Sequence, residues 1–519
     1  MRIVFRPRYI AAGLLLAAVP LCLAPARGQQ IAIPRIEQMP SMPSPYLMRD
    51  WKSVARGYDS LAFDLDRTGQ YLPLVFLNTG TVNYPGTTSF GLHSYVGDDR
   101  SESGEAINVL PAVLSGVLNG IDKRSQNGRD WVVMSQEYFN NRPAEDVYLN
   151  SPASNSGSDW WYDVMPNVFF YQLAGKYPGA GDEAHQFTRV AERWLQAVTA
   201  MGGSVAPWSH PGLEHRGWHL STMTPNNAMP HEPEAGGSIG WILYHAWVVT
   251  GDARYRYGAE LCMEELNAYM TNPAYELQLA YGTSLAARMN AEAGTAFDVE
   301  KMVNWCFDIS PIRSWGATVG TWGSYDCAGL IGEVNGSNDY AFAMNTFQQI
   351  GALVPMVRYD ARFARAIGRW ALNAANASRL FYGGYLPDAN QDSRAWSRQE
   401  DPRSFIAYEA LRQRGPGTVA PYATGDAIAG GWAPTNLSLY SSSHAGILGA
   451  IIDTTEVRGI LKLDLLATDH FHAPAYPSYL LYNPDSIAHG VQLAVGVGNA
   501  DVYDAAARAF VVRGATGAA

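Results

Sequence analysis

Seven acidic residues lie in three stretches of the sequence that are also rich in aromatic residues and glycine. Hydrolysis of a glycosidic bond needs one protonated carboxyl group, which protonates the leaving oxygen, and one carboxylate, which acts as base or nucleophile. Aromatic rings beside such groups offer flat apolar faces that suit sugar rings. The candidate catalytic residues are Asp159 and Asp163 in SDWWYD, Glu232 and Glu234 in PHEPEAGG, and Asp326, Glu333 and Asp339 in WGSYDCAGLIGEVNGSNDY.

We expect Glu234 to be the general acid and Asp159 or Asp163 to be the opposing carboxylate. The two aspartates would share one helical face at a spacing where like charges destabilise, unless the pair serves a site. The structural alternative is that these acids only stabilise helix starts. Asp159 could be an N-cap, and Pro233 at a first helical position would place Glu232 and Glu234 in the first turn, where the helix dipole favours negative charge.

Asp326, Glu333 and Asp339 are held in reserve for the same chemistry. Ser337 or Asn338 could cap the following helix and make Asp339 an ordinary first-turn residue. Glu333 lies among glycines, where capping is not an obvious explanation.

Aromatic and polar residues of the same stretches are expected to bind the substrate. Indole rings would stack on sugar faces, and the polar groups would contact hydroxyls. The histidines are not spaced as in a zinc protease motif, and the acids near Asp388 lack the spacing of a calcium loop, so we expect no metal and no cofactor. The candidate substrate-binding residues are Trp160, Trp161, His231, Arg313, Trp315, Trp322, Tyr325 and Trp432.

The elements that must position these loops are helical hairpins, because one amphipathic pattern recurs along the chain. Apolar residues at i, i+4, i+7, i+8 and i+11 follow a turn aspartate each time, which predicts a repeated two-helix unit that must stack on its neighbours. The repeats are Phe187, Ala191, Trp194, Leu195 and Val198 after Asp182, then Tyr255, Ala259, Cys262, Met263 and Leu266 after Asp252, then Phe363, Ile367, Trp370, Ala371 and Ala374 after Asp360.

The connections between these helices are unequal in a regular way. The outer helices follow short turns, whereas several core-rich helices, near 160, 235, 339 and 443, follow long loops. In a ring of antiparallel hairpins the long loops all emerge on one rim, and binding concentrates in such loops. We also expect helices over 340–358, 404–412, 444–453 and 457–468, and short strands after 471.

Export features, paired helices with TGD-type turns, Trp- and Gly-rich loops and a β appendage resemble the (α/α)6-barrel, or six-hairpin, glycoside hydrolases and their polysaccharide-lyase relatives. The resemblance covers roughly residues 100–470 and identifies no particular family. It implies a mainly α fold with a small C-terminal β module. The expected organisation is a signal peptide over 1–28, a tether and packing segment over 29–100, a barrel over 101–470 and a β domain over 471–519.

The N-terminus has the pattern of a cleavable export signal, with arginines before a short apolar run and small residues near 24–28. A secreted or periplasmic location follows, with no membrane association after cleavage. Cleavage would leave Cys262, Cys306 and Cys327, of which only Cys306 and Cys327 are near enough in sequence to suggest a disulfide.

The net charge of -11 argues against a nucleic-acid partner, and the expected substrate is a neutral or weakly charged glycan. Two alternatives stay open. One is a lyase with a His or Tyr base and an arginine such as Arg216, Arg288 or Arg313 to neutralise a uronate. The other is a non-catalytic glycan-binding protein. The oligomeric state is not predicted.

Overall fold

The computed structural model describes residues 29–99, 104–142 and 145–518, so the expected signal peptide lies outside the described residues. The chain divides into a large compact unit, Gln30–Gln492, and a second unit that contains the C-terminal segment from Leu493. No helix among the described residues is both long enough and apolar enough to cross a membrane.

The large unit is built around a closed ring of helices, which confirms the predicted mainly α fold and the (α/α)6 barrel. In the described chain, each inner helix packs against the next, and the last returns to the first. The inner ring consists of α3 (Ala106–Leu118), α5 (Trp160–Ala174), α7 (Ala235–Thr250), α9 (Gln278–Glu292), α11 (Ala343–Met356) and the broken helix α15 (Leu439–Ser443) with α16 (Ala445–Ile451).

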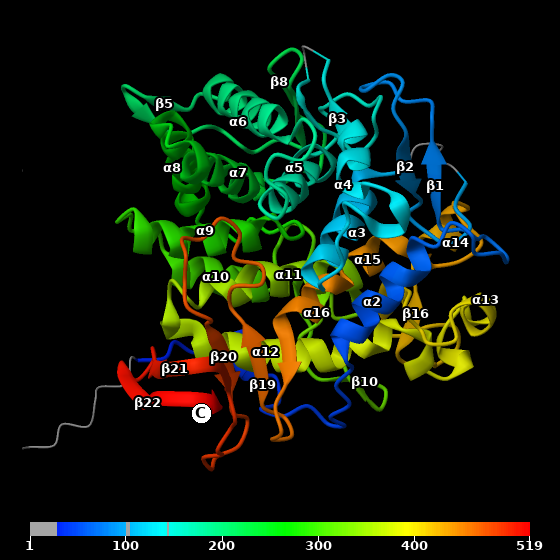
Figure 1. Ribbon diagram of the computed structural model, residues 1–519, viewed down its shortest axis with the longest axis vertical. Coiled ribbons are helices and arrows are strands. Elements are labelled where there is room, and N and C mark those ends of the chain that lie inside the picture. The colour runs from blue at the N-terminus through cyan, green and yellow to red at the C-terminus, as the bar shows by residue number, and fades with distance from the viewer. Residues whose placement is uncertain (1–28, 100–103, 143–144, 519) are drawn as a thin grey trace, which may run out of the picture. The chain divides into compact units, whose positions relative to one another are not determined.

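A second layer of helices covers this ring, and Figure 1 shows α7 and α8 side by side as one of the hairpins. The outer layer consists of α2 (Trp51–Ala62), the short α4 (Trp131–Met134), α6 (Glu183–Ala200), α8 (Ala253–Ala268), α10 (Val299–Phe307) and α12 (Ala364–Ala377). Thus α2, which lies in the segment expected to be a tether and packing segment, is one of the outer helices and packs on α16 and α3.

The sequence patterns explain why the two layers differ. In α7 the residues from Ala235 to Ala246 are all buried, because the helix is surrounded by the rest of the barrel. The outer helices α6 and α8 instead bury one stripe, which contains most of their repeated apolar residues, whereas α12 is buried from Ala366 to Ala377. The side chain of Asp252 caps α8 through the backbone N–H of Arg254 (2.9 Å). Asp182 does not cap α6.

Five short strands form an antiparallel sheet in the long connections before α11 and α15. Our prediction of a helix over 404–412 is wrong, and the helix predicted from Tyr340 begins instead at Ala343. Each strand is too short to show its own periodicity, and Tyr340 pairs with the distant Arg412. The strand order is β16 (Tyr422–Thr424), β15 (Ala410–Arg412), β13 (Tyr340–Phe342), β12 (Ile331–Glu333) and β9 (Trp315–Ala317).

The helix predicted over 457–468 is also wrong, because Leu461, Leu463 and Leu465 are buried in alternation, which is a strand pattern. The resulting sheet is three-stranded and belongs to the large unit: β18 (Ile452–Thr454), β19 (Leu461–Asp464) and β20 (Tyr479–Tyr482). In the second unit, β21 (Ala494–Asp504) and β22 (Ala509–Ala518) form an antiparallel hairpin with irregular register.

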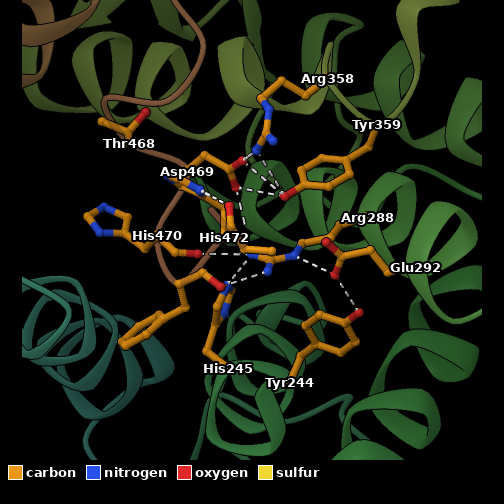
Figure 2. Close-up of polar contacts among 12 residues, drawn as sticks. Tyr244, His245, Arg288, Glu292, Arg358, Tyr359, Thr468, Asp469, His470 and His472 are labelled. Carbon is orange, nitrogen blue, oxygen red and sulfur yellow. Dashed lines mark hydrogen bonds and ion pairs between the residues drawn. The ribbon is translucent and has the colours of Figure 1, made fainter. Parts of the chain in front are cut away.

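The C-terminal ends of the inner helices are covered by residues 467–471, which we call the base segment. Arg288 of α9 donates to the backbone carbonyls of His470 (2.9 Å) and Phe471 (3.0 Å). Asp469 forms an ion pair with Arg358 and accepts from the Tyr359 hydroxyl (3.0 Å). Figure 2 shows these side chains converging on the base segment, where the structure has a small cavity.

Inside the barrel, buried polar side chains join the inner helices. Gln172 donates to the Tyr281 hydroxyl (3.0 Å), which donates to Gln348 (2.5 Å), and Gln348 contacts His444. Burial lowers the pKa of His444 to about 3, so the ring is neutral. Hydrogen-bonded side chains thus fill the inside of the barrel and link it to the base segment. The long loops precede the N-terminal ends of the inner helices, at the other end of the barrel.

The thiols of Cys262, Cys306 and Cys327 are buried and unpaired in the described residues, so Cys306 and Cys327 do not form the disulfide considered above.

Candidate active site

Carboxyl groups gather at the end of the barrel where the inner helices begin. Tyr162, in the first turn of α5, experiences the charges of several of these carboxyl groups. Burial raises the pKa of its hydroxyl, and the negative charges of Glu105, Asp159, Glu276 and Glu409 raise it further. These acids precede four different inner helices, so one rim collects them, as expected for long loops on a common face.

Of the two acids before α7, Glu232 has the more strongly raised pKa. Its side chain is buried, and among the described residues its Oε2 atom has no hydrogen-bond partner. Burial raises the pKa of Glu232 to about 10, and the charges of Asp159, Glu276 and Glu234 add to the effect. Glu232 is therefore protonated at neutral pH, which is the state that a proton donor requires.

Asp159 caps helix α5, and its charge also acts on Glu232. Its Oδ1 caps α5 by accepting from the backbone N–H of Tyr162 (3.0 Å), and its Oδ2 lies 3.6 Å from a guanidinium nitrogen of Arg216. Burial raises the pKa of Asp159, and the charge of Glu276 acts in the same direction. The backbone carbonyl of Arg216 in turn accepts from the N–H of Trp160 (2.8 Å), which ties the start of α5 to the loop that precedes α7.

Glu276 lies just before α9 and is held by a cation. Its Oε1 forms an ion pair with Arg313, and its Oε2 accepts from the side-chain amide of Asn345 (3.3 Å). The same guanidinium donates through Nε to Glu333 (2.8 Å). It also lies 5.1 Å from the ring centroid of Trp315. Glu276 is not among the residues predicted from the sequence, because it lies outside the three acidic stretches considered there.

Glu234 and Asp163 are engaged inside the protein. Glu234 has no exposed surface and accepts from the backbone N–H groups of Glu276 (2.7 Å) and Leu279 (3.1 Å), so it caps α9. Burial raises the pKa of Glu234 to about 7. Asp163 is buried and accepts from the backbone N–H of Gly157 (2.7 Å). Burial raises its pKa well above the ordinary value.

The reserve acids divide between different places. Glu333 reaches the carboxyl group of Glu276 through Arg313. Asp326 instead accepts from the backbone N–H groups of Ala328 (3.1 Å) and Ser44 (3.4 Å), and it stands on the β10–β11 hairpin, Thr321–Trp322 with Tyr325–Asp326. That hairpin also carries the expected sugar-binding residues Trp322 and Tyr325.

Asp339 closes a turn by accepting from the backbone N–H of Gly336 (2.9 Å). Its place in the turn between β12 and β13 accounts for its conformation.

The aromatic candidates differ in exposure. Trp160 is fully buried, and its indole N–H donates to the carbonyl of His215 (2.9 Å). Trp161 is 8% exposed and Trp315 is 2% exposed, whereas Trp432 is 40% exposed. His231 is half-buried, and its Nε2 lies 3.4 Å from the carbonyl of Asn227. Tyr162 and Tyr275 are half-buried and were not among the binding candidates. Burial raises the pKa of both hydroxyls, and the negative charge of Glu276 adds to the effect in each.

A second acidic group lies toward α15. Glu409 is buried, and it accepts from the Tyr440 hydroxyl (2.5 Å) and from the backbone N–H of Asp426 (2.7 Å). Asp426 in turn accepts from the hydroxyl of Tyr340 (3.1 Å). The described residues contain no group of three or more His, Cys, Asp or Glu side chains suited to a metal ion.

No protein-family model and no curated protein match the chain. Among solved structures, it is similar to the unsaturated glucuronyl hydrolase from Bacillus sp. GL1, described as responsible for the degradation of glycosaminoglycan, with 11% identity over 66% of this chain and 95% of that chain and a TM-score of 0.31. It is also similar to a β-1,3-1,4-glucanase from Paenibacillus sp. X4, with 11% identity over 79% of this chain and 95% of that chain and a TM-score of 0.34. These overlaps are weak, so the barrel assignment rests on the packing of the chain's own helices.

Proposed function

We propose that the protein is a glycoside hydrolase in which Glu232 is the general acid and Asp159 or Glu276 is the opposing carboxylate. The observation that supports this proposal is that the side chain of Glu232 is buried and its Oε2 has no hydrogen-bond partner among the described residues. Burial raises the pKa of Glu232 to about 10, and the charges of Asp159 and Glu276 from other loops add to the effect. One acid held neutral next to carboxylates is the division of roles that glycosidic-bond hydrolysis needs. Tyr162 and Tyr275 stand around the group and would contact the sugar.

The charges at this rim favour a neutral or weakly charged glycan. Arg313 is occupied by the carboxylates of Glu276 and Glu333. Arg216 lies beside Asp159 and donates to the carbonyl of Met229 (3.2 Å). A uronate would have to compete with these bonds for a cation, so β-elimination by a lyase is less well supported than hydrolysis.

The test is release of reducing ends from a panel of purified polysaccharides by the wild-type protein, Glu232→Gln and a control, Glu300→Gln. Glu300 is an exposed acid in the first turn of α10. We expect Glu232→Gln to lose about 100-fold or more in turnover, the range typical of general acid catalysis, and the control to match wild type. Full activity of Glu232→Gln would refute the assignment. Products that absorb ultraviolet light would indicate a lyase, and binding without turnover would indicate a glycan-binding protein.

We also propose that the protein is exported, on the basis of its N-terminal sequence pattern. N-terminal sequencing of protein recovered from the periplasm or medium of an expressing bacterium tests this. A start near residues 25–29 is expected, and retention of Met1 on cytoplasmic protein would contradict it.

A further inference from the structure

We infer that Glu276, rather than Asp159, is the carboxylate that acts opposite Glu232, and that Arg313 is the positioning residue that orients it. This inference rests on the proposed function and deepens it, because it chooses between two residues that the proposal leaves open. It also changes the role of Arg313 from the substrate contact expected from the sequence.

The bonds of the two acids differ in kind. Oδ1 of Asp159 caps α5, and its Oδ2 lies 3.6 Å from a guanidinium nitrogen of Arg216. Glu276 forms a direct ion pair with Arg313 and accepts from the neutral amide of Asn345. A carboxylate has about four lone-pair positions, so these two bonds leave acceptor capacity on both oxygens of Glu276.

Exposure points the same way. The side chain of Glu276 is 18% exposed, compared with 12% for Asp159. Glu232 itself is 1% exposed. Among these acids, Glu276 is therefore the one with most surface available for a substrate or a water molecule, while its neighbour Glu232 carries the proton.

The setting of Arg313 fits a positioning residue. Its guanidinium is bound by two carboxylates, Glu276 and Glu333, so it has a fixed direction. It lies over aromatic rings, 5.0 Å from the centroid of Tyr275 and 5.1 Å from that of Trp315, which limits its hydration. In such surroundings the ion pair is stronger than it would be in water. Glu333 then anchors the arginine and has no need to react.

The first experiment separates the two acids chemically. Glu276→Ala and Asp159→Ala are assayed on the most active polysaccharide with and without sodium azide, a small anion that can occupy the place of a lost carboxylate. We expect azide to raise the rate of Glu276→Ala at least about 10-fold and to leave Asp159→Ala unchanged. Rescue of Asp159→Ala alone, or of neither variant, would overturn the inference.

The second experiment tests Arg313 through the separate values of kcat and KM. A residue that orients the reacting carboxylate, rather than binding the substrate, affects the chemical step. In Arg313→Gln we therefore expect kcat to fall at least about 10-fold, with KM changed less than about twofold. Arg313→Lys should restore part of kcat, and Glu333→Gln should lower it less. An unchanged kcat in Arg313→Gln, or an effect confined to KM, would overturn this role.

The two kinds of failure are distinguishable. If wild type cleaves no glycan, the proposed hydrolase fails and this inference fails with it. If wild type cleaves a glycan but azide does not rescue Glu276→Ala, the inference alone is overturned.

Discussion

Replacing Glu234 by Gln distinguishes two possible roles of this residue, a helix cap and a catalytic proton donor. Glu234 accepts from the backbone N–H groups of Glu276 and Leu279, and it has no exposed surface. The amide of glutamine has one oxygen, so one of these N–H groups loses its acceptor. Loss of a cap costs about 0.5–2 kcal/mol. The variant should therefore be less stable than wild type in acid, where neither side chain carries a charge.

The difference should change sign with pH. Burial raises the folded-state pKa of Glu234 from 4.5 to about 7. A group with a raised pKa contributes its full stability below the unfolded pKa, and that stability is lost as the pH rises through the folded pKa. Each pH unit between the two pKa values is worth about 1.4 kcal/mol, which gives about 3 kcal/mol in total. Glutamine does not titrate, so the variant escapes this loss and should equal or exceed wild type above pH 7.

The assay is urea unfolding of wild type and Glu234→Gln at pH values from 4.5 to 8, with Glu300→Gln as the control. The stability curves of wild type and Glu234→Gln are expected to converge or cross between pH 5 and pH 8, whereas the control should follow wild type throughout. Parallel curves would refute the reasoning. Loss of turnover with an unchanged stability profile would mean that Glu234 takes part in the chemistry, as the sequence alone suggested.

Two further predictions follow from buried charges. Because burial raises the pKa of Glu232 to about 10, the protonated acid persists to high pH, and the alkaline limb of kcat/KM should fall near pH 10; a limb below pH 7 in an assay across pH 4–11 would contradict this. Lys123 and Asp59 form a buried ion pair, so Lys123→Met should lower the free energy of unfolding by about 3–5 kcal/mol, as measured by urea denaturation. Exposed Lys52→Met is the control, and Lys123→Met with Asp59→Leu should recover most of the loss; equal stability of Lys123→Met and wild type would argue against the pair.

The barrel could be predicted because its helices repeat a local pattern. Tyr255, Ala259 and Leu266 have the spacing of one buried helical face, and all three are buried. The same spacing in α6 and α12 required partners on both sides, and a ring supplies them. The starts of two helices could also be predicted, because the side chains of Asp252 and Asp159 both accept hydrogen bonds from backbone N–H groups of the first turn.

The rim sheet could not be predicted in the same way. Its strands are short, and the pairing of Tyr340 with Arg412 joins residues that are remote in sequence. No local periodicity reports such a bond. The same limit explains the wrong helix over 404–412, where a few apolar residues fit either period.

For the site, the sequence pointed to loops but did not resolve the bonding of single carboxyl groups. It favoured Glu234 over Glu232, but the structure gives Glu234 to the cap of α9 and leaves an oxygen of Glu232 without a partner among the described residues. Burial and bonding of two acids separated by one proline depend on α9, which begins more than forty residues later. Glu276 and its bond to Arg313 depend on the same long-range packing.

Ring closure also limits the order in which the protein can mature. Helix α2 finds its place against α16, close to the other end of the large unit, and the base segment follows later still. A chain emerging vectorially from a ribosome or a translocon therefore exposes its first hairpins, with their apolar faces unpaired, until almost the whole unit has emerged. We expect folding of the protein to depend on chaperones. We also expect a chain truncated before residue 472 to aggregate rather than fold.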